Sequence, residues 1–333
     1  MKNLIVRFQW TKIQVLTLLA LLSINAFSQQ LLTPLKGQFF EQGYGQNEEF
    51  TGDEESVDIT FNTVGETFMC GWVENLDYLA EGISETHIDA AFWRINQFGK
   101  QLNFKAFKGN LNEEARGITL DNEASVAVCI RKSNDFDNQL VSLGDSIVII
   151  KFDTSGNPIF TKSIGYQNDE ELSFGIAPID IVTDSEGDFI VLANKISTIP
   201  YQFESEYEPS KIEPVLIKIS NSGTIVWTRE YTNEEHSIEA QELLIRSDET
   251  IQFTANNKTS SPYPSVFLFE DDGSFSYKYN YTQLSNIEVI GIAQHVFGDY
   301  YLAGTKNDGD ETDGYLIKLD EDYNYLTSIA VGT

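Results

Sequence analysis

Residues 94–99 read Arg-Ile-Asn-Gln-Phe-Gly, a short turn between two apolar runs. The same form, a cation followed five positions later by glycine, returns at Lys151–Gly156 and at Lys218–Gly223. A fourth copy, Leu268–Gly273, keeps the glycine without the cation, and a fifth, Lys318–Tyr323, keeps the cation without the glycine. Successive copies start 57, 67, 50 and 50 residues apart. Spacings of this size in a strand-rich chain predict a propeller or another repeat array.

Each repeat contains two hairpins, as the copy from 115 to 164 illustrates. Two β-branched runs around the polar turn at 122–124 predict the first hairpin, and two further runs around Asp153–Gly156 predict the second. An Asp at the start of such a turn and a Gly near its end are typical of a type I turn closed by a left-handed residue. The residues after 28 show no helical period over three turns, which indicates an all-β protein.

Four strands in each of five repeats predict a β-propeller of five four-stranded blades. The stretch Gly37–Tyr44 resembles one more strand before the first complete repeat, so a sixth, incomplete blade is the alternative. We expect first hairpins near 56–72, 116–131, 176–194, 239–255 and 288–304, and second hairpins near 90–107, 146–164, 214–231, 265–281 and 314–331.

The second hairpins carry a family resemblance. An aromatic residue four positions after the turn glycine, as in Ser155–Phe160, Ser222–Trp227 and Asp272–Tyr277, resembles the outer-hairpin signature of quinoprotein-like (PQQ-like) propellers. The phrase Asp313–Asp320 looks like the repeat of secreted bacterial propeller proteins. The likeness covers nearly all of the chain after the leader. It implies the fold rather than an activity.

This resemblance also implies the strand order. The first hairpin of each blade becomes its inner pair and the second its outer pair. Phe160, Trp227 and Tyr277 then pack between adjacent blades as core residues. The quinone-dependent enzymes of this fold have more blades and adjacent paired cysteines, which this sequence lacks, so we expect no organic cofactor.

Residues 1–28 predict a secretory signal peptide. Three cations precede the apolar stretch Val15–Leu22, and small residues in Ala26–Ser28 indicate cleavage before Gln29. A retained N-terminal anchor is the alternative. We expect residues 29–333 to form a single β-propeller domain that is exported to the periplasm, the cell surface or the medium. No later segment is apolar enough to span a membrane.

The chain is strongly acidic, with 22 basic and 51 acidic residues and a net charge of −29. Removing the three leader cations leaves 19 basic residues and a net charge of −32. Such a surface excludes nucleic acid and anionic lipid and favours cations or basic partners. The two cysteines, Cys70 and Cys129, occupy equivalent places in consecutive repeats, so we expect two buried free thiols rather than a disulfide.

An acidic motif follows most outer strands, where the chain enters the next blade. We expect these motifs to ring one end of the central channel. A ring of carboxylates could bind calcium. The alternative is that each acid caps a turn of its own blade, and the recurrence of the motif in every blade favours this alternative. The motifs are Asn47-Glu48-Glu49, Asn112-Glu113-Glu114, Asn168-Asp169-Glu170, Asn233-Glu234-Glu235 and the weaker Asn286-Ile287-Glu288.

The same end receives the longest loops, which join inner to outer hairpins, and loops on a rigid scaffold are common places for function. In the loop 195–213, Tyr201, Phe203, Glu204 and Tyr207 interleave aromatic rings with a carboxylate. Rings can stack on a sugar while a carboxylate accepts hydrogen bonds from its hydroxyls. These four residues are the candidate ligand-binding residues.

The loop 305–313 is a compact acidic segment. Asp308, Asp310 and Asp313 are candidate ligands for calcium, although their spacing does not match an EF-hand. The alternative for this loop, and for the aromatic one, is a solvated acidic loop. Calcium is therefore the one ion that we consider.

The sequence contains no recognised catalytic motif, and we assign no catalytic residues. We predict a secreted, non-enzymatic binding module that takes a glycan or a protein through its acidic, loop-bearing face, and we expect it to be monomeric. One alternative is a glycoside-active propeller with a carboxylate pair in the channel. A purely structural surface component is the other alternative.

Overall fold

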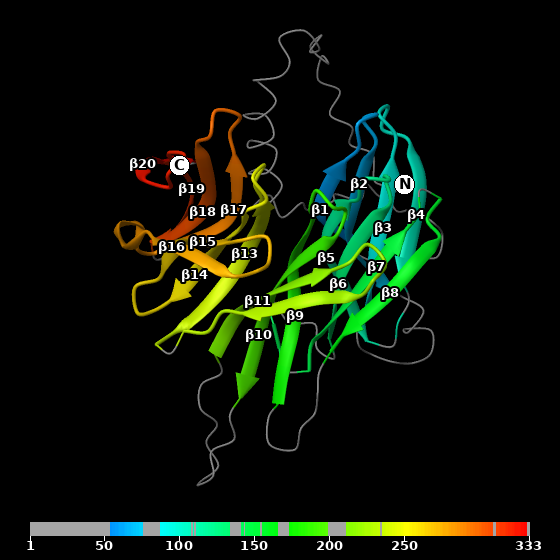
Figure 1. The fold of residues 1–333 in the computed structure, drawn as a ribbon, viewed down its shortest axis with the longest axis horizontal. Helices are drawn as coiled ribbons and strands as arrows, with labels where there is room; N and C mark the ends of the chain where they lie inside the picture. Colours follow the sequence, from blue (N-terminus) through cyan, green and yellow to red (C-terminus); the bar gives the residue numbers. More distant parts are fainter. Residues whose placement is uncertain are drawn as a thin grey trace.

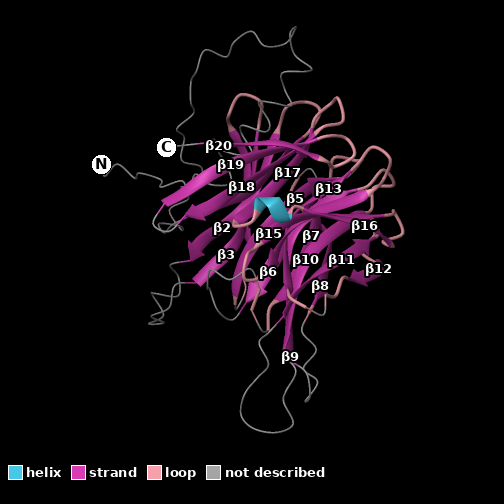
Figure 2. Cartoon of the chain, turned by 90° about the vertical axis from the view of Figure 1, so that its left-hand side faces the viewer, coloured by secondary structure: helices cyan, strands magenta, loops and turns pink. Residues whose placement is uncertain are grey.

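The computed structural model contains an all-β protein. Five four-stranded antiparallel sheets make up nearly all of the described part, where the short 3-10 helix η1 (Thr282–Leu284) is the single helix (Figure 2). The structure describes residues 54–331 except 76–86, 108, 110, 134–140, 143, 154, 166–172, 199–210, 234 and 309–310.

Each sheet is one blade, formed by four strands that follow one another in the chain. Figure 1 shows the blades in chain order, from the blue and cyan strands on the right to the orange and red strands on the left. The strands are β1 (Glu54–Phe61), β2 (Thr67–Asn75), β3 (His87–Ile95), β4 (Gln101–Phe107), β5 (Asn112–Leu120), β6 (Val126–Ser133), β7 (Ser146–Phe152), β8 (Pro158–Ile164), β9 (Ser173–Thr183), β10 (Phe189–Thr198), β11 (Lys211–Ile219), β12 (Ile225–Glu230), β13 (Ser237–Ile245), β14 (Ile251–Lys258), β15 (Tyr263–Phe269), β16 (Phe275–Asn280), β17 (Ile287–Gln294), β18 (Tyr300–Asp308), β19 (Glu311–Leu319) and β20 (Tyr325–Val331).

The predicted architecture is confirmed. The blades are five, each predicted hairpin is present, and the first strand of each blade contacts the first strand of the next along the series β1, β5, β9, β13 and β17. First hairpins are therefore the inner pairs. The predicted signal peptide and the extra stretch Gly37–Tyr44 lie outside the described residues.

The ten hairpin turns share one geometry. In each turn the residue at position one exchanges backbone hydrogen bonds with those at positions four and five, as Asn62 does with Gly65 and Glu66. Position four has a positive φ in every turn, which favours glycine. The residues at position four are Gly65, Gly99, Ala124, Gly156, Gly187, Gly223, Glu249, Gly273, Gly298 and Tyr323.

The cation of the repeat signature joins the two hairpins of its own blade. It forms an ion pair with a carboxylate in the turn of the first hairpin, so the turns of the inner and outer pairs are held together. The pairs are Arg94–Glu66 (2.9 Å), Lys151–Asp121 (2.7 Å), Lys218–Asp184 (2.8 Å) and Lys318–Asp299 (2.5 Å).

The fourth blade, which has Leu268 in place of the cation, has Arg246 at the start of the first turn, where the second and third blades have Asp121 and Asp184. The guanidinium of Arg246 lies 6.0 Å from the ring centre of Tyr323 in the fifth blade. Tyr323 is the residue that replaces the fifth turn glycine, and it stacks on Tyr300 with ring centres 4.5 Å apart. The two departures from the repeat thus meet at one interface between blades.

The aromatic residue after the turn packs on the next blade in two cases, as predicted. The ring of Phe160 lies against Gly223 and the ring of Trp227 against Gly273, so closely that a Cβ on either glycine would lie about 3 Å from the ring. Both rings also pack against buried core clusters. Turn glycines therefore serve the packing of the neighbouring blade as well as their own turn.

The prediction that Tyr277 is a core residue was wrong. Its side chain is 56% exposed. The next turn has Tyr323 where Phe160 and Trp227 meet a glycine, so there is no flat surface for the ring to cover. Tyr279 stacks on Tyr323 instead, and Tyr277 packs on the outside of Tyr279.

The core lies between successive blades, where the apolar faces of the sheets meet. Cys70 and Cys129 are both buried there as free thiols, as predicted, and burial raises the pKa of each thiol well above its usual value. The part of the chain that the structure describes has no helix long and apolar enough to cross a membrane.

The contribution of the ion pair between the two hairpins of a blade to stability should increase with the burial of the pair. The Lys151–Asp121 side chains are only 4% and 0% exposed, so Lys151→Met leaves a buried carboxylate without its cation and should reduce the free energy of unfolding by about 3–5 kcal/mol. Urea unfolding followed by circular dichroism measures the loss. Lys318→Met, at the more exposed equivalent pair, is the matched control and should move the midpoint far less. Equal losses in the two variants would contradict the assignment.

Candidate functional site

The two ends of the propeller differ in construction. We call the end with the ten hairpin turns the turn end, and the end where β2, β6, β10, β14 and β18 finish and the blades connect the loop end. The candidate ligand-binding residues of the loop end, Tyr201, Phe203, Glu204 and Tyr207, lie outside the described residues. Their role stays a prediction.

The candidate metal ligands are only partly described. Asp310 lies outside the described residues, and Asp308 is the last residue of β18, with its side chain not described. Asp313 lies in β19 directly opposite Lys306 of β18. The calcium assignment therefore stays a prediction.

The innermost strands place glutamates at the loop end. Each innermost strand has a β-bulge, and the residue two positions before the bulged one is glutamate in four of the five blades. The third blade has Ala177 there. These glutamates lie at one level of the ring because the five bulges share a register. They are Glu55, Glu114, Glu239 and Glu288.

Three of these glutamates are paired with cations. The Glu114 carboxylate lies 2.7 Å from the guanidinium of Arg116. The Lys258 ammonium lies 2.8 Å from both Glu239 and Glu288, and so joins the fourth blade to the fifth. Carboxylates in such pairs hold neighbouring strands together and are engaged as acceptors.

The second blade has a buried ion pair where the third and fourth blades have an asparagine amide. Asn194 and Asn256 each exchange two hydrogen bonds with the backbone of the next blade's innermost strand. The equivalent residue of the second blade is Arg131, whose Nε lies 2.8 Å from Asp145, with both side chains at most 2% exposed. Asp145 also accepts a hydrogen bond from the amide of Ser142.

This ion pair fixes a loop against the third blade. Residues 144 and 145 form backbone hydrogen bonds with β9, from Gly144 to Phe174 and from Ile176 to Asp145. Arg131 is thus a structural cation.

Glu113 is a carboxylate with strongly altered acidity. Burial raises its pKa to about 7, against the lowering effect of Lys132, whose ammonium lies 3.3 Å away, while the charge of the buried Asp89 raises it further. Its Oε2 atom is buried without a hydrogen-bond partner among the described residues. A carboxyl group that holds its proton near neutral pH has the property required of a general acid.

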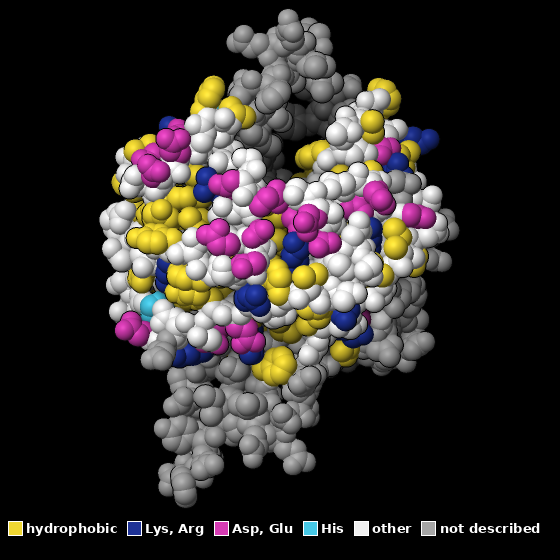
Figure 3. Space-filling model, viewed as in Figure 1, with side chains coloured by type: hydrophobic (Ala, Val, Ile, Leu, Met, Phe, Trp, Pro, Cys, Tyr) yellow, Lys and Arg dark blue, Asp and Glu magenta, His cyan; other side chains and the backbone are white. Residues whose placement is uncertain are grey.

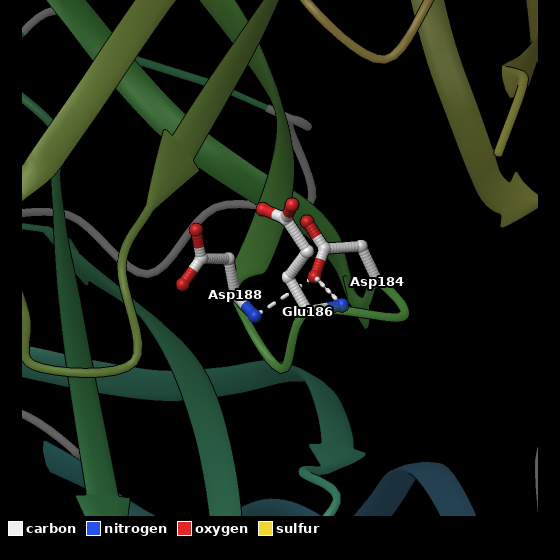
Figure 4. A group of neighbouring side chains, drawn as sticks. All are labelled: Asp184, Glu186 and Asp188. Atoms are coloured by element: carbon white, nitrogen blue, oxygen red, sulfur yellow. Dashed lines mark hydrogen bonds between the residues drawn. The ribbon is translucent and has the colours of Figure 1, made fainter.

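The turn end contains a three-carboxylate cluster in one turn of the third blade. Oxygens of Asp184, Glu186 and Asp188 lie within 4.8 Å of one another (Figure 4). Asp184 Oδ1 accepts the amide hydrogens of Glu186 and Asp188, so it caps the turn. The Lys218 ammonium lies 2.8, 3.7 and 3.9 Å from the three carboxylates.

Lys218 already supplies the positive charge that this cluster needs. Burial opposes its charge, but the hydrogen bond to Asp184 and the three carboxylates outweigh burial and raise the pKa of the ammonium. A divalent metal would have to displace it. The cluster is therefore part of the ion pair that joins the two hairpins of the third blade.

Exposed carboxylates gather at the turn end. Figure 3 shows Asp and Glu side chains across the middle of the face that it draws. In the described turns Lys100 is the one exposed cation. The exposed acids of these turns are Glu123, Glu186, Asp248, Glu270, Asp271, Asp272, Glu321 and Asp322.

Sequence reasoning located some of these groups and missed others. The motifs Asn112–Glu114 and Ile287–Glu288 lie at the start of innermost strands, as expected of a ring at one end of the channel. The motifs at 47–49 and 168–170 lie outside the described residues. The shared level of the four glutamates was missed, because only the bulges reveal it, and so was the acidic turn end.

Comparisons with known proteins agree with the fold. No model of a known protein family matches the chain, and no curated protein is detectably similar to it in sequence. A protein of unknown function from Dyadobacter fermentans DSM 18053 is similar in structure, with a TM-score of 0.54 and 9% identity over 86% of this chain and 85% of that one. This likeness shows a shared β-propeller fold and no activity.

Two propellers with named activities are more distant. A glycosyl hydrolase from Bacteroides ovatus has a TM-score of 0.38 and 9% identity, covering 84% of this chain and 88% of its own. An α-L-arabinofuranosidase from Clostridium thermocellum ATCC 27405 has a TM-score of 0.41 and 10% identity, covering 84% and 94%. At these scores neither likeness bears on function, and the resemblance to quinoprotein-like repeats stays a prediction.

The raised pKa of Glu113 should make stability depend on pH. The folded protein binds a proton at this group between about pH 4.5 and 7 that the unfolded chain releases, so the contribution of Glu113 to stability is present below pH 4.5 and is lost as pH rises to 7. Glu113→Gln should therefore remove part of the decline in the free energy of unfolding across this range. Urea titrations at pH 5 and pH 8 measure the decline. Glu123→Gln, in an exposed turn, is the control, and an unchanged slope in Glu113→Gln would refute the assignment.

Proposed function

We propose that the mature chain is an exported, non-enzymatic β-propeller that binds a glycan or a protein at its loop end. The observation that carries the proposal is the state of the carboxylates there: Glu114, Glu239 and Glu288 are all held in ion pairs. Paired carboxylates suit a rigid docking surface better than acid–base catalysis, which needs a group free to exchange protons.

Two further features support binding at the loop end. Ser142, Gly144 and Asp145 are held against β9 by the buried Arg131–Asp145 pair and backbone hydrogen bonds, which gives this part of the loop end a fixed backbone. The loop with Tyr201 and Tyr207 supplies aromatic rings next to carboxylates, the chemistry that stacks on sugars. The leader at 1–28 supports an exported protein.

A glycoside-active propeller is the second candidate, and Glu113 is the observation that favours it. Its raised pKa suits a proton donor to a leaving group. A catalyst also requires a second carboxylate as nucleophile or base across a bound sugar. Asp89 is the acidic neighbour whose charge acts on Glu113, and its side chain is 0% exposed, so it offers no surface to a water molecule or a sugar.

The binding proposal is tested with mature protein on a glycan array and in pull-downs with proteins of the producing cell's surface. We expect saturable binding that the double variant Tyr201→Ala/Tyr207→Ala weakens by roughly tenfold or more, the loss of one to two stacked aromatic contacts. Phe297→Ala, which removes an 81% exposed ring at the turn end, is the matched control and should bind normally.

Three outcomes would count against this proposal. Loss of binding in Phe297→Ala would place the ligand at the turn end. Hydrolysis of a glycoside that Glu113→Gln abolishes would establish the enzyme reading. An absence of any ligand on the array and in the pull-downs would favour a purely structural component.

A further inference from the structure

A polar cluster lies at the loop end between the third and fourth blades, around Lys278 of β16. The Lys278 ammonium donates a hydrogen bond to Oδ1 of Asn257 at 2.8 Å, and Nε2 of His236 lies 3.1 Å from the same oxygen. The ammonium also lies 4.8 Å from the ring centre of Phe267. Lys278 and His236 are partly exposed, whereas Asn257 is fully buried.

Neutral groups hold this cluster in place. Nδ2 of Asn257 donates to the hydroxyl of Ser265 at 2.6 Å, and that hydroxyl donates to Oδ1 of Asn280 at 2.7 Å. Asn233 lies 3.4 Å from the His236 ring. The cluster therefore presents a cation among amide and hydroxyl groups, and its outer members, Asn233 and Asn280, reach the surface.

Lys278 has no carboxylate partner among the described residues, and the partly buried Lys105 and Lys162 share this property. No ion pair includes it, and burial is the single cause that lowers the pKa of its ammonium, to about 8. A half-buried ammonium without a counter-charge favours a bound anion. The cations with a carboxylate partner are Arg94, Arg116, Arg131, Lys132, Lys151, Lys195, Lys218, Arg246, Lys258 and Lys318.

Comparison between blades shows how the counter-charge was lost. At the place of Asn257 the third blade has Lys195, and at the place of Asn280 it has Glu230. Those two residues form an ion pair of 2.8 Å. The fourth blade has asparagine at both places, and the ammonium of Lys278, two positions before Asn280 in β16, lies against Asn257. A neutral pair has become a site with one positive charge.

We propose that the Lys278 cluster binds the carboxylate of a single uronic acid unit. The surrounding asparagine side chains donate hydrogen bonds to the hydroxyls of this sugar and accept hydrogen bonds from them. The cation supplies one charge-assisted hydrogen bond, and the amides suit sugar hydroxyls, which both donate and accept. The net charge of −29 disfavours a polyanion, so the ligand is a glycan with one such unit at the contact rather than a densely charged polymer. This inference rests on the proposed function and names the ligand's charge at the same end of the propeller.

The inference is tested by calorimetric titration of the mature protein with glucuronate, glucose and acetate. We expect glucuronate to bind roughly tenfold or more tightly than glucose, the range of a charge-assisted hydrogen bond, and acetate to bind more weakly than glucuronate. Lys278→Gln should lower glucuronate affinity to that of glucose, and Lys278→Arg should retain a preference for the acid.

Lys195→Gln, which removes the paired cation at the third-blade position equivalent to Asn257, is the matched control and should leave glucuronate binding unchanged. Circular dichroism melting of each variant verifies folding. Equal affinity for glucose and glucuronate, or an unchanged glucuronate affinity in Lys278→Gln, would overturn the inference while leaving the proposed function standing. Binding of acetate as tight as that of glucuronate would show a site for any carboxylate and would also overturn it. Loss of all sugar binding together with a blank glycan array would overturn both.

Discussion

The fourth residue of each hairpin turn must adopt a positive φ, and this steric constraint underlies the whole propeller. It fixes the length of the turn, and thereby the pairing of both strands that the turn joins. Glycine meets the constraint without strain in seven turns, while Ala124, Glu249 and Tyr323 meet it as other residue types. With the registers set, the cation of the outer hairpin faces the acid of the inner one. The two hairpins then act as one sheet.

Much of the fold was readable in the sequence because these constraints are local. The turn at Asp153–Gly156 could be recognised from its own residues, and its cation and glycine repeat across the chain. Tyr277 could not be placed in the same way, because its exposure depends on Tyr323 some 46 positions later. The shared position of Glu114 and Glu288 at one height of the ring could not be predicted for a similar reason. A bulge becomes visible only when two paired strands are compared residue by residue.

The candidate sites arise where blades depart from the repeat. Asn194 and Asn256 give the expected link between blades, whereas Arg131 replaces it with an ion pair that fixes a loop. In the fourth blade the ion pair seen between Lys195 and Glu230 is replaced by amides and an unpaired ammonium. Positions that recur in every blade support the scaffold, and positions that change charge in one blade are better candidates for recognition. Composition alone could not separate the two kinds, since the chain is acidic throughout.

Every blade is formed from four strands that are consecutive in the chain, with each strand paired to its immediate neighbours in sequence. Strand pairing within a blade therefore closes only short loops and has a small entropic cost. A chain is synthesised from its N-terminus, and each blade becomes complete as soon as its own residues have been made. Successive blades can then assemble against the preceding apolar face, so that the growing molecule keeps only its newest face uncovered. This order of assembly would limit aggregation, because the chain would otherwise expose several unpaired strands at once.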